Sequence, residues 1–266
     1  MAITLQESLR AVFYAPFYVA LARGAYTQEG VEVRFVSAPT PAEAANGLLD
    51  GSVDVCWGGP MRVMETWQKW PGCDLVCFAE VVTRDPFMLV GRSSRPGFQL
   101  ADLVGMSVAT VSEVPTPWLC LQQDLRDVGL DPAGLDRAAG LSMTEACARL
   151  RGGELDAVQV FEPFASELER DGSGYVLQAA ATRGPTSYTV FYAPRPLLTA
   201  RRAELAAMVR AIQRTQKWLA RAQPSEIAAT IAAFLPTVSP ANLTAASARY
   251  KALGIWGHDP RLPRLG

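Results

Sequence analysis

The stretch LDGSVDVCWGGPMRVME, from Leu49 to Glu65, decides the fold. Its apolar centre is typical of a buried strand, which runs into two glycines and a proline and then into a helical pattern. A strand that gives way to a helix in this manner exposes backbone N–H groups at the helix start, where they suit a bound anion. An ordinary strand-to-helix turn with a surface arginine explains the same residues.

A second stretch, LRGGELDAVQVFEP at residues 150–163, follows the same plan. In both stretches a helix ends, a glycine-containing turn and an acidic residue follow, and a short apolar strand leads to a proline-marked turn. We therefore expect two α/β lobes, each of which offers strand ends and helix starts to a shared cleft. Ligands prefer this place in open α/β sheets.

The chain around these two stretches alternates strands with helices. The hydrophobic pattern predicts strands at 3–9, 31–36, 53–57, 75–82, 87–90, 107–110, 157–161, 176–179 and 188–192. It predicts helices at 16–23, 41–50, 60–70, 117–128, 142–151, from 163, and at 200–222, 224–234 and 240–253. This alternation indicates βαβ units and a mainly parallel sheet in each lobe.

The composition excludes several classes of protein. The chain has 266 residues, of which 49% are hydrophobic and 19% charged, and its formal net charge is −1. This length suffices for one large domain or two lobes. The near-neutral charge argues against nucleic acid as a partner, and no apolar run is long enough to cross a bilayer. We expect a globular protein without direct membrane insertion.

The cysteines and the N-terminus bear on the compartment. The five cysteines are an odd number and lie in apolar surroundings, so we interpret them as buried free thiols, which favours a reducing compartment. Their spacing does not fit a zinc site. The first ten residues, MAITLQESLR, lack the basic and apolar segments of a signal peptide. We expect a cytoplasmic protein if Met1 is the natural start, and a periplasmic one if a signal peptide was removed.

Four segments together resemble one protein family. They are FYAPFYVALARGAYTQEGVEV at 13–33, AANGLLDGSVDV at 44–55, LADLVGMSVAT at 100–110 and GELDAVQVFEPFASELERDG at 153–172. Their order and spacing resemble the type II periplasmic-type solute-binding proteins, in particular the sulfonate, taurine and thiamine-pyrimidine binders (SsuA, TauA and ThiY). The resemblance covers nearly the whole chain.

The resemblance implies a two-lobed α/β fold of the periplasmic-binding-protein-like II type. Each lobe is then a mixed, mainly parallel sheet flanked by helices, with the ligand cleft between the lobes. Lobe one is expected at 1–90 and 190–266 and lobe two at 91–189, with crossings near 90–92 and 187–190 that serve as a hinge. The resemblance further implies a small-molecule ligand, bound by lobe closure, and the permease of an ABC-type importer as a possible partner.

Candidate ligand contacts of the first lobe follow its strands. Arg10 suits an anionic group, and Phe13 and Tyr14 suit a planar one, although a solvated arginine and core aromatics are alternatives. Gly58 and Gly59 allow the backbone to approach a ligand without a Cβ. Trp57 either flanks the ligand or packs beneath the following helix. Arg62 suits a carboxylate, sulfonate or phosphate, which an arginine holds bidentately, or it simply pairs with Glu65.

The remaining candidates lie in the second lobe and near the crossings. Arg84 either lines the hinge or forms a structural pair with Asp85. Ser112, Glu113 and Thr116 precede a helix expected to open at Pro117, where hydroxyls and N–H groups form an anion site or Thr116 is an ordinary N-cap. Glu162 suits an amine or aminopyrimidine. Tyr188 is a further cleft candidate.

Enzymes remain an alternative class. The single histidine, His258, lies in a C-terminal segment expected to be irregular surface, and the chain has no P-loop or dinucleotide motif. A fold relative, hydroxymethylpyrimidine phosphate synthase, holds pyridoxal phosphate on a lysine and uses a histidine, and those positions correspond to Gly58 and Arg62. Because glycine has no amine, this chemistry is not expected. We expect no catalytic residue, cofactor or metal, and a monomer. A menaquinone-pathway-like enzyme and a cytosolic ligand sensor stay open.

Overall fold

The structure is a computed structural model that describes residues 1–263, apart from the side chain of residue 42. It divides into two compact units. Unit 1 comprises 1–84 and 184–266 and unit 2 comprises 85–183. The expected boundary at residue 90 falls inside a strand, Met88–Gly91, that pairs with two strands of unit 2. This strand therefore belongs entirely to unit 2.

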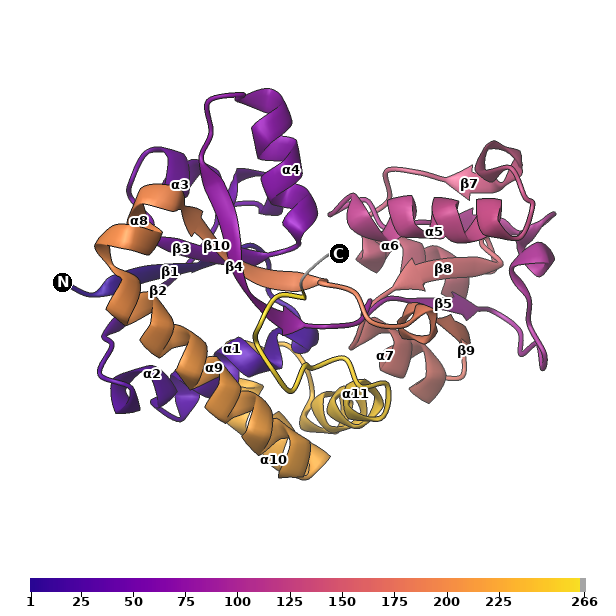
Figure 1. Ribbon diagram of the computed structural model, residues 1–266. Helices are drawn as coiled ribbons and strands as arrows, with labels where there is room; N and C mark the ends of the chain where they lie inside the picture. Colours follow the sequence, from indigo (N-terminus) through magenta and orange to yellow (C-terminus); the bar gives the residue numbers. More distant parts are fainter. Residues whose placement is uncertain (264–266) are drawn as a thin grey trace. The chain divides into compact units, whose positions relative to one another are not determined.

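Unit 1 is built on a five-stranded mixed sheet with the order β2-β1-β3-β10-β4 (Figure 1). Its strands are β1 (Ile3–Glu7), β2 (Val33–Ser37), β3 (Val55–Gly58), β4 (Leu75–Val82) and β10 (Thr189–Pro194). β1 runs parallel to β2 and β3, whereas β10 is antiparallel to β3 and β4. After unit 2 the chain returns to unit 1 as β10, which lies between β3 and β4, two strands that precede unit 2 in the sequence.

Helices cover both faces of the unit 1 sheet (Figure 1). They are α1 (Ala15–Ala22), α2 (Ala25–Gln28), α3 (Asn46–Leu49), α4 (Pro60–Lys69), α8 (Arg195–Ala200), α9 (Arg202–Arg221), α10 (Pro224–Ile231) and α11 (Pro240–Ala252). Alternating side chains of β3 face opposite layers. Cys56 packs with Leu48 of α3 and Val63 of α4, whereas the ring of Trp57 stacks on Phe17 of α1.

Unit 2 carries a second mixed sheet with the order β7-β6-β8-β5-β9. Its elements are β5 (Met88–Gly91), β6 (Ser107–Ala109), α5 (Thr116–Asp127), β7 (Asp136–Ala138), α6 (Met143–Arg151), β8 (Ala157–Val160), α7 (Phe164–Arg170) and β9 (Tyr175–Ala179). Leu89 of β5 packs with the residues of α5, whereas its neighbour Val90 lies against Gly174, beside Leu150 and Leu168. Helices therefore cover both faces of this sheet as well.

The fold class expected from the sequence is confirmed: the chain is a mixed α/β protein with two mixed sheets flanked by helices. The helix expected at 41–50 is wrong, because this segment is a 3-10 turn at Pro41–Glu43 followed by the short α3. The helix expected at 200–222 is observed as α9. Two elements were not predicted, namely α8 before α9 and the edge strand β7. β7 has only three residues, too few to display an alternating pattern.

The segment after α11 also differs from the irregular surface expected. Trp256 forms an antiparallel bridge with Val82 at the edge of the sheet, and the Gly257 N–H donates to the Val81 carbonyl at 3.1 Å. Ile255, Trp256 and Gly257 are buried. This segment therefore continues the sheet beyond β4 and covers part of its otherwise open edge.

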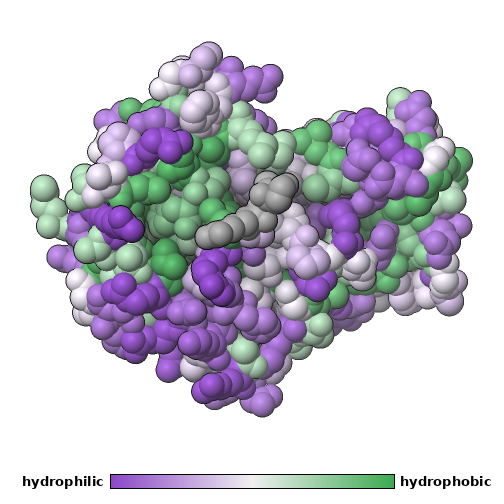
Figure 2. Space-filling model, in the orientation of Figure 1, coloured by the Kyte–Doolittle hydropathy of each residue, from purple (hydrophilic) through white to green (hydrophobic). Residues whose placement is uncertain are grey.

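The surface of unit 1 is uneven in polarity. Figure 2 shows hydrophilic surface over α9 and α10 and hydrophobic surface over β4 and β10. On β4, residues Val76, Cys77 and Phe78 are only partly buried.

All five cysteines are free thiols. None of the helices in residues 1–263 combines the length and apolarity needed to cross a membrane.

Candidate functional site

Four side chains and two glycines of unit 1 converge where β1 and β3 end and α4 begins. Ser8 directly follows β1, Tyr14 ends a 3-10 turn at Val12–Tyr14, and Tyr192 lies on β10. Gly58 ends β3, and Arg62 stands in the first turn of α4. We call this group, together with Gly59, the β1–β3 cluster.

Contacts link the members of the β1–β3 cluster. The hydroxyls of Ser8 and Tyr14 are hydrogen-bonded at 3.2 Å. A Cβ added to Gly58 would lie 3.3 Å from Ser8 Oγ and 3.5 Å from the Tyr192 hydroxyl. Glycine at this position therefore leaves room for the side chains of Ser8 and Tyr192 at the end of β3.

Electrostatics tie Arg62 to the same cluster. Burial raises the pKa of Tyr14 to about 12, while the hydrogen bond from Ser8 and the charge of Arg62 act in the opposite direction. Burial also raises the pKa of Tyr192, again opposed by Arg62. Both phenols are therefore neutral donors at physiological pH, next to a permanent cation.

The start of α4 is suited to an anion. Gly59 is the N-cap and offers no side-chain cap, and Pro60 at the first helical position has no N–H. The helix N-terminus carries a partial positive charge, and Arg62 adds a full one. The Arg62 Nη1 donates to Glu65 Oε2 at 2.9 Å, so the side chain is held on its own helix. Gly59, Pro60, Met61 and Arg62 are all partly exposed.

Arg10 is held by a buried acid. Glu7, only 2% exposed, accepts hydrogen bonds from Arg10, from Ser37 and from the Tyr18 hydroxyl. The Arg10 Nε and Nη2 are occupied in this way, and no hydrogen bond from Nη1 is found among residues 1–263. Arg10 thus remains at the end of β1 with one side of its guanidinium available.

The other aromatic candidates of unit 1 are largely buried. Trp57 is fully buried, with ring centroids 4.3 Å from Phe17 and 5.5 Å from Phe35. It packs in the core against α1 and β2, and not beneath the following helix α4, which was the alternative to a place beside the ligand. Phe13 is 2% exposed and Tyr188 8%, and their rings meet edge to face at 6.3 Å.

The candidates of unit 2 lie after β6 and β8. The Ser112 hydroxyl donates to the Leu141 carbonyl at 2.7 Å, and Glu113 accepts from the Met143 N–H at the start of α6. α5 begins at Thr116 itself, with Pro115 as its N-cap, so neither a start at Pro117 nor capping by Thr116 is correct. Glu162 is fully buried and accepts from the Ser166 hydroxyl at 2.9 Å.

Asp85, which the sequence offers as one possible partner of Arg84, forms its ion pair with Arg183. Asp85 accepts from Arg183 at 3.1 Å and from the Phe87 N–H at 2.9 Å. Arg183 also pairs with Asp124. Asp85 and Arg183 are the first and last residues of unit 2, so this ion pair ties together the two ends of that unit. Arg84 lies on the unit 1 side of the boundary.

Sequence reasoning did not single out Ser8 or Tyr192. Ser8 follows a strand end, which is a recognisable local signal. Tyr192 reaches the cluster only because β10 inserts antiparallel beside β3, with Val190 opposite Gly58. No local sequence pattern predicts the pairing of β10 with β3.

Comparisons with known proteins decide the family. The profile described as NMT1/THI5 like matches residues 13–227. The chain belongs to the NMT1/THI5-like family. It is 23% identical over 262 residues to the Bacillus subtilis (strain 168) protein named "Putative binding protein YtlA", covering 98% of this chain and 78% of that one.

Solved structures of other proteins have the same fold as this NMT1/THI5-like protein. The periplasmic aliphatic sulphonate binding protein SsuA from Escherichia coli superposes with a TM-score of 0.78 at 19% identity, covering 94% of this chain and 83% of that chain. The periplasmic nitrate-binding protein NrtA from Synechocystis PCC 6803 gives a TM-score of 0.67 at 18% identity, covering 92% and 69%. The resemblance to solute-binding proteins expected from the sequence is therefore confirmed.

Proposed function

We propose that this NMT1/THI5-like protein is the solute-binding component of an ABC-type importer. Its ligand would be a small organic molecule with a carboxylate, sulfonate or phosphate group, planar in part. The observation that carries the proposal is the β1–β3 cluster, in which neutral hydroxyl donors, a helix start and Arg62 are gathered at one strand end. Such a set of convergent donors is what a bound anion requires.

Similar proteins of known structure support this proposal, since they include binding proteins for sulphonate and nitrate, both of which are anions. Residues Gly58, Gly59 and Arg62 are proposed as the main unit 1 contacts, with Arg10 and Tyr14 beside them. Ser112, Glu113 and Thr116 are proposed as the contribution of unit 2. Arg84, Glu162, Phe13 and Tyr188 are proposed as outer or supporting positions.

We further propose that binding favours closure of the two units. A ligand that contacts both units only in the closed form shifts the population toward the closed form.

A binder rather than an enzyme is the function that these residues favour. Gly58 has no amine for a Schiff base, and Arg62 stands where the related synthase has a histidine. His258 lies on the segment beyond β4 and not among the residues of the β1–β3 cluster. Residues 1–263 hold no group of three or more His, Cys, Asp or Glu side chains placed to bind a metal ion. A permease partner and a monomeric state are part of the proposal, as is a periplasmic location in the case that a signal peptide is removed.

The test is a thermal-shift screen of the purified chain against sulfonates, aromatic carboxylates, pyrimidines, pyridoxal compounds and nitrate. A ligand that binds only the native state raises the melting temperature. Hits are then measured by calorimetry, and each mixture is inspected for product by mass spectrometry. Saturable binding with the ligand recovered intact supports the proposal. Steady conversion of a ligand, or stabilisation only by cationic compounds, overturns it.

A further inference from the structure

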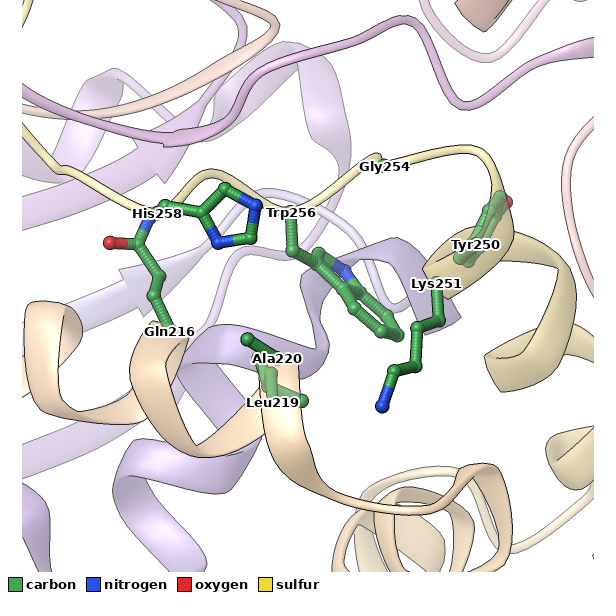
Figure 3. Close-up of a pocket in the computed structure, with 8 residues that line it drawn as sticks. All are labelled: Gln216, Leu219, Ala220, Tyr250, Lys251, Gly254, Trp256 and His258. Carbon is green, nitrogen blue, oxygen red and sulfur yellow. The ribbon is translucent and has the colours of Figure 1, made fainter.

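A cavity of about 140 Å³ lies in unit 1 between α9, α11 and the segment beyond β4 (Figure 3). Its lining includes Leu219 and Ala220 from α9, Lys251 from α11, and Trp256 and His258 from the C-terminal segment. We call it the C-terminal cavity. An apolar protein cavity of roughly 150 Å³ is known to hold benzene, so the volume suits one six-membered ring.

The wall of the C-terminal cavity is fixed by backbone and indole contacts. The Trp256 indole N–H donates to the Phe13 carbonyl at 3.0 Å, and the Trp256 side chain is 6% exposed. The Thr83 N–H donates to the Ile255 carbonyl at 2.9 Å, which holds the segment against the end of β4. The C-terminal segment that lines the cavity is therefore held in place by hydrogen bonds. It has a flat aromatic wall that is already in place before any ligand arrives.

Lys251 brings a positive charge to the C-terminal cavity. Lys251 and His258 have the basic side chains among its described lining residues, and that lining contains no carboxylate. In Figure 3 they lie on opposite sides of the Trp256 indole. Lys251 donates one hydrogen bond to the Ala222 carbonyl just after α9. An ammonium group has three donors, so two remain for a ligand.

We propose that the C-terminal cavity is a second small-molecule site, which takes a small aromatic carboxylate. The ring would pack against Trp256 and Leu219, and the carboxylate would accept hydrogen bonds from Lys251. This site lies apart from the β1–β3 cluster and does not use Arg62. It holds independently of the ligand bound at that cluster.

The test uses 4-fluorobenzoate with ¹⁹F NMR on the full chain, and 4-fluorobenzyl alcohol as the ring without the charge. Ala220→Leu fills the cavity from an exposed position on α9, so the fold should tolerate it. Ala206→Leu is the matched control, because Ala206 is exposed on the same helix but is not among the lining residues. Lys251→Met removes the charge and keeps the length of the side chain.

We expect saturable binding of 4-fluorobenzoate to Arg62→Ala, in which binding of this carboxylate at the β1–β3 cluster is weakened, and equal affinity when Ala206→Leu is added to that variant. In the same background Ala220→Leu should abolish this binding, Lys251→Met should weaken it at least tenfold, and the alcohol should bind at least tenfold more weakly than the acid. Binding that survives when Ala220→Leu is added to Arg62→Ala would place the probe elsewhere and overturn the proposal. No saturable binding to Arg62→Ala would overturn it as well. Because Arg62→Ala separates the two sites, failure here leaves the proposed transport function standing.

Discussion

The carboxylate of Glu7 receives two hydrogen bonds from the guanidinium of Arg10, at 3.0 Å from Nε and 2.6 Å from Nη2. The acid is buried while the arginine side chain is 44% exposed. The hydrogen bond to Glu7 is the main cause that raises the pKa of Arg10. This pair orients the Arg10 guanidinium at the end of β1. It also gives the buried Glu7 carboxylate an opposite charge, without which burial of that carboxylate would be costly.

Glu7→Gln should destabilise the protein. The amide keeps the volume of the side chain but loses the charge that Arg10, Ser37 and Tyr18 all donate to. Hydrogen bonds to charged groups contribute about 1.5–3 kcal/mol each, so we expect a loss of about 2 kcal/mol in the free energy of unfolding. Urea denaturation measures it. Glu32→Gln, at an exposed position just before β2, is the control and should change stability by less than about 0.5 kcal/mol.

Arg62→Ala should weaken binding of the anionic ligand found in the screen by tenfold or more. One charge-assisted contact of about 1.5–3 kcal/mol accounts for that change. Glu65→Gln is the informative partner, because Glu65 holds Arg62 at 2.9 Å and does not belong to the β1–β3 cluster. It should leave affinity unchanged or raise it, since the arginine is then freer to turn to the ligand. Calorimetry on both variants decides, and equal affinities for wild type and Arg62→Ala would remove Arg62 from the site.

Gly58→Ala should impair binding more than folding. Its Cβ would lie 3.3 Å from Ser8 Oγ, which is tight enough to displace that side chain by a few tenths of an ångström, and 3.4 Å from Tyr192 Cε1, an ordinary contact. Ligand affinity should fall at least fivefold, while the melting temperature changes little. Gly72→Ala is the control, because nothing lies within 4 Å of its added Cβ and its φ is not positive. If both variants bind as wild type does, the end of β3 does not contact the ligand.

The sequence predicted those parts of the structure that local patterns encode. β4 was expected with its observed bounds, and α4 with its start at Pro60, because a proline and two glycines mark that boundary. Gly58, Gly59 and Arg62 are singled out as candidates for the same reason. Alternation along β3 could not say which of Cys56 and Trp57 faces which helix layer, so the core position of Trp57 stayed open until the structure placed Phe17 and Phe35 against it.

Long-range pairing accounts for what the sequence did not predict. Tyr192 joins the β1–β3 cluster through β10, which comes more than a hundred residues after β3 in the chain. The pairing of Asp85 with Arg183 likewise depends on two distant segments that meet at the ends of unit 2. The same applies to Trp256, whose hydrogen bond to Phe13 spans nearly the whole chain.

The Asp85–Arg183 pair gives a prediction about pH whose sign is not obvious from the ion pair alone. Burial is the largest influence on the pKa of Asp85 and raises it, and Arg183 and the Phe87 N–H offset this only in part. A carboxyl with a raised pKa in the folded state binds its proton more tightly there than in the unfolded chain. Its contribution to stability is therefore fully present below an unfolded pKa of about 3.9 and is lost as the pH rises through the folded value.

Urea denaturation of wild type and Asp85→Asn between pH 4 and pH 7 tests this sign. The stability of wild type relative to the variant should decrease as the pH rises above about 4, because only wild type must ionise the buried carboxyl. Asp156→Asn is the opposite case: hydrogen bonds from Ser107 and Arg92 lower the pKa of Asp156, so there the relative stability of wild type should increase as the pH rises to about 4, and the measurements on this variant are extended below pH 4. Two slopes of the same sign would mean that Arg183 outweighs burial at Asp85, and that this ion pair stabilises the ends of unit 2 rather than merely satisfying a buried acid.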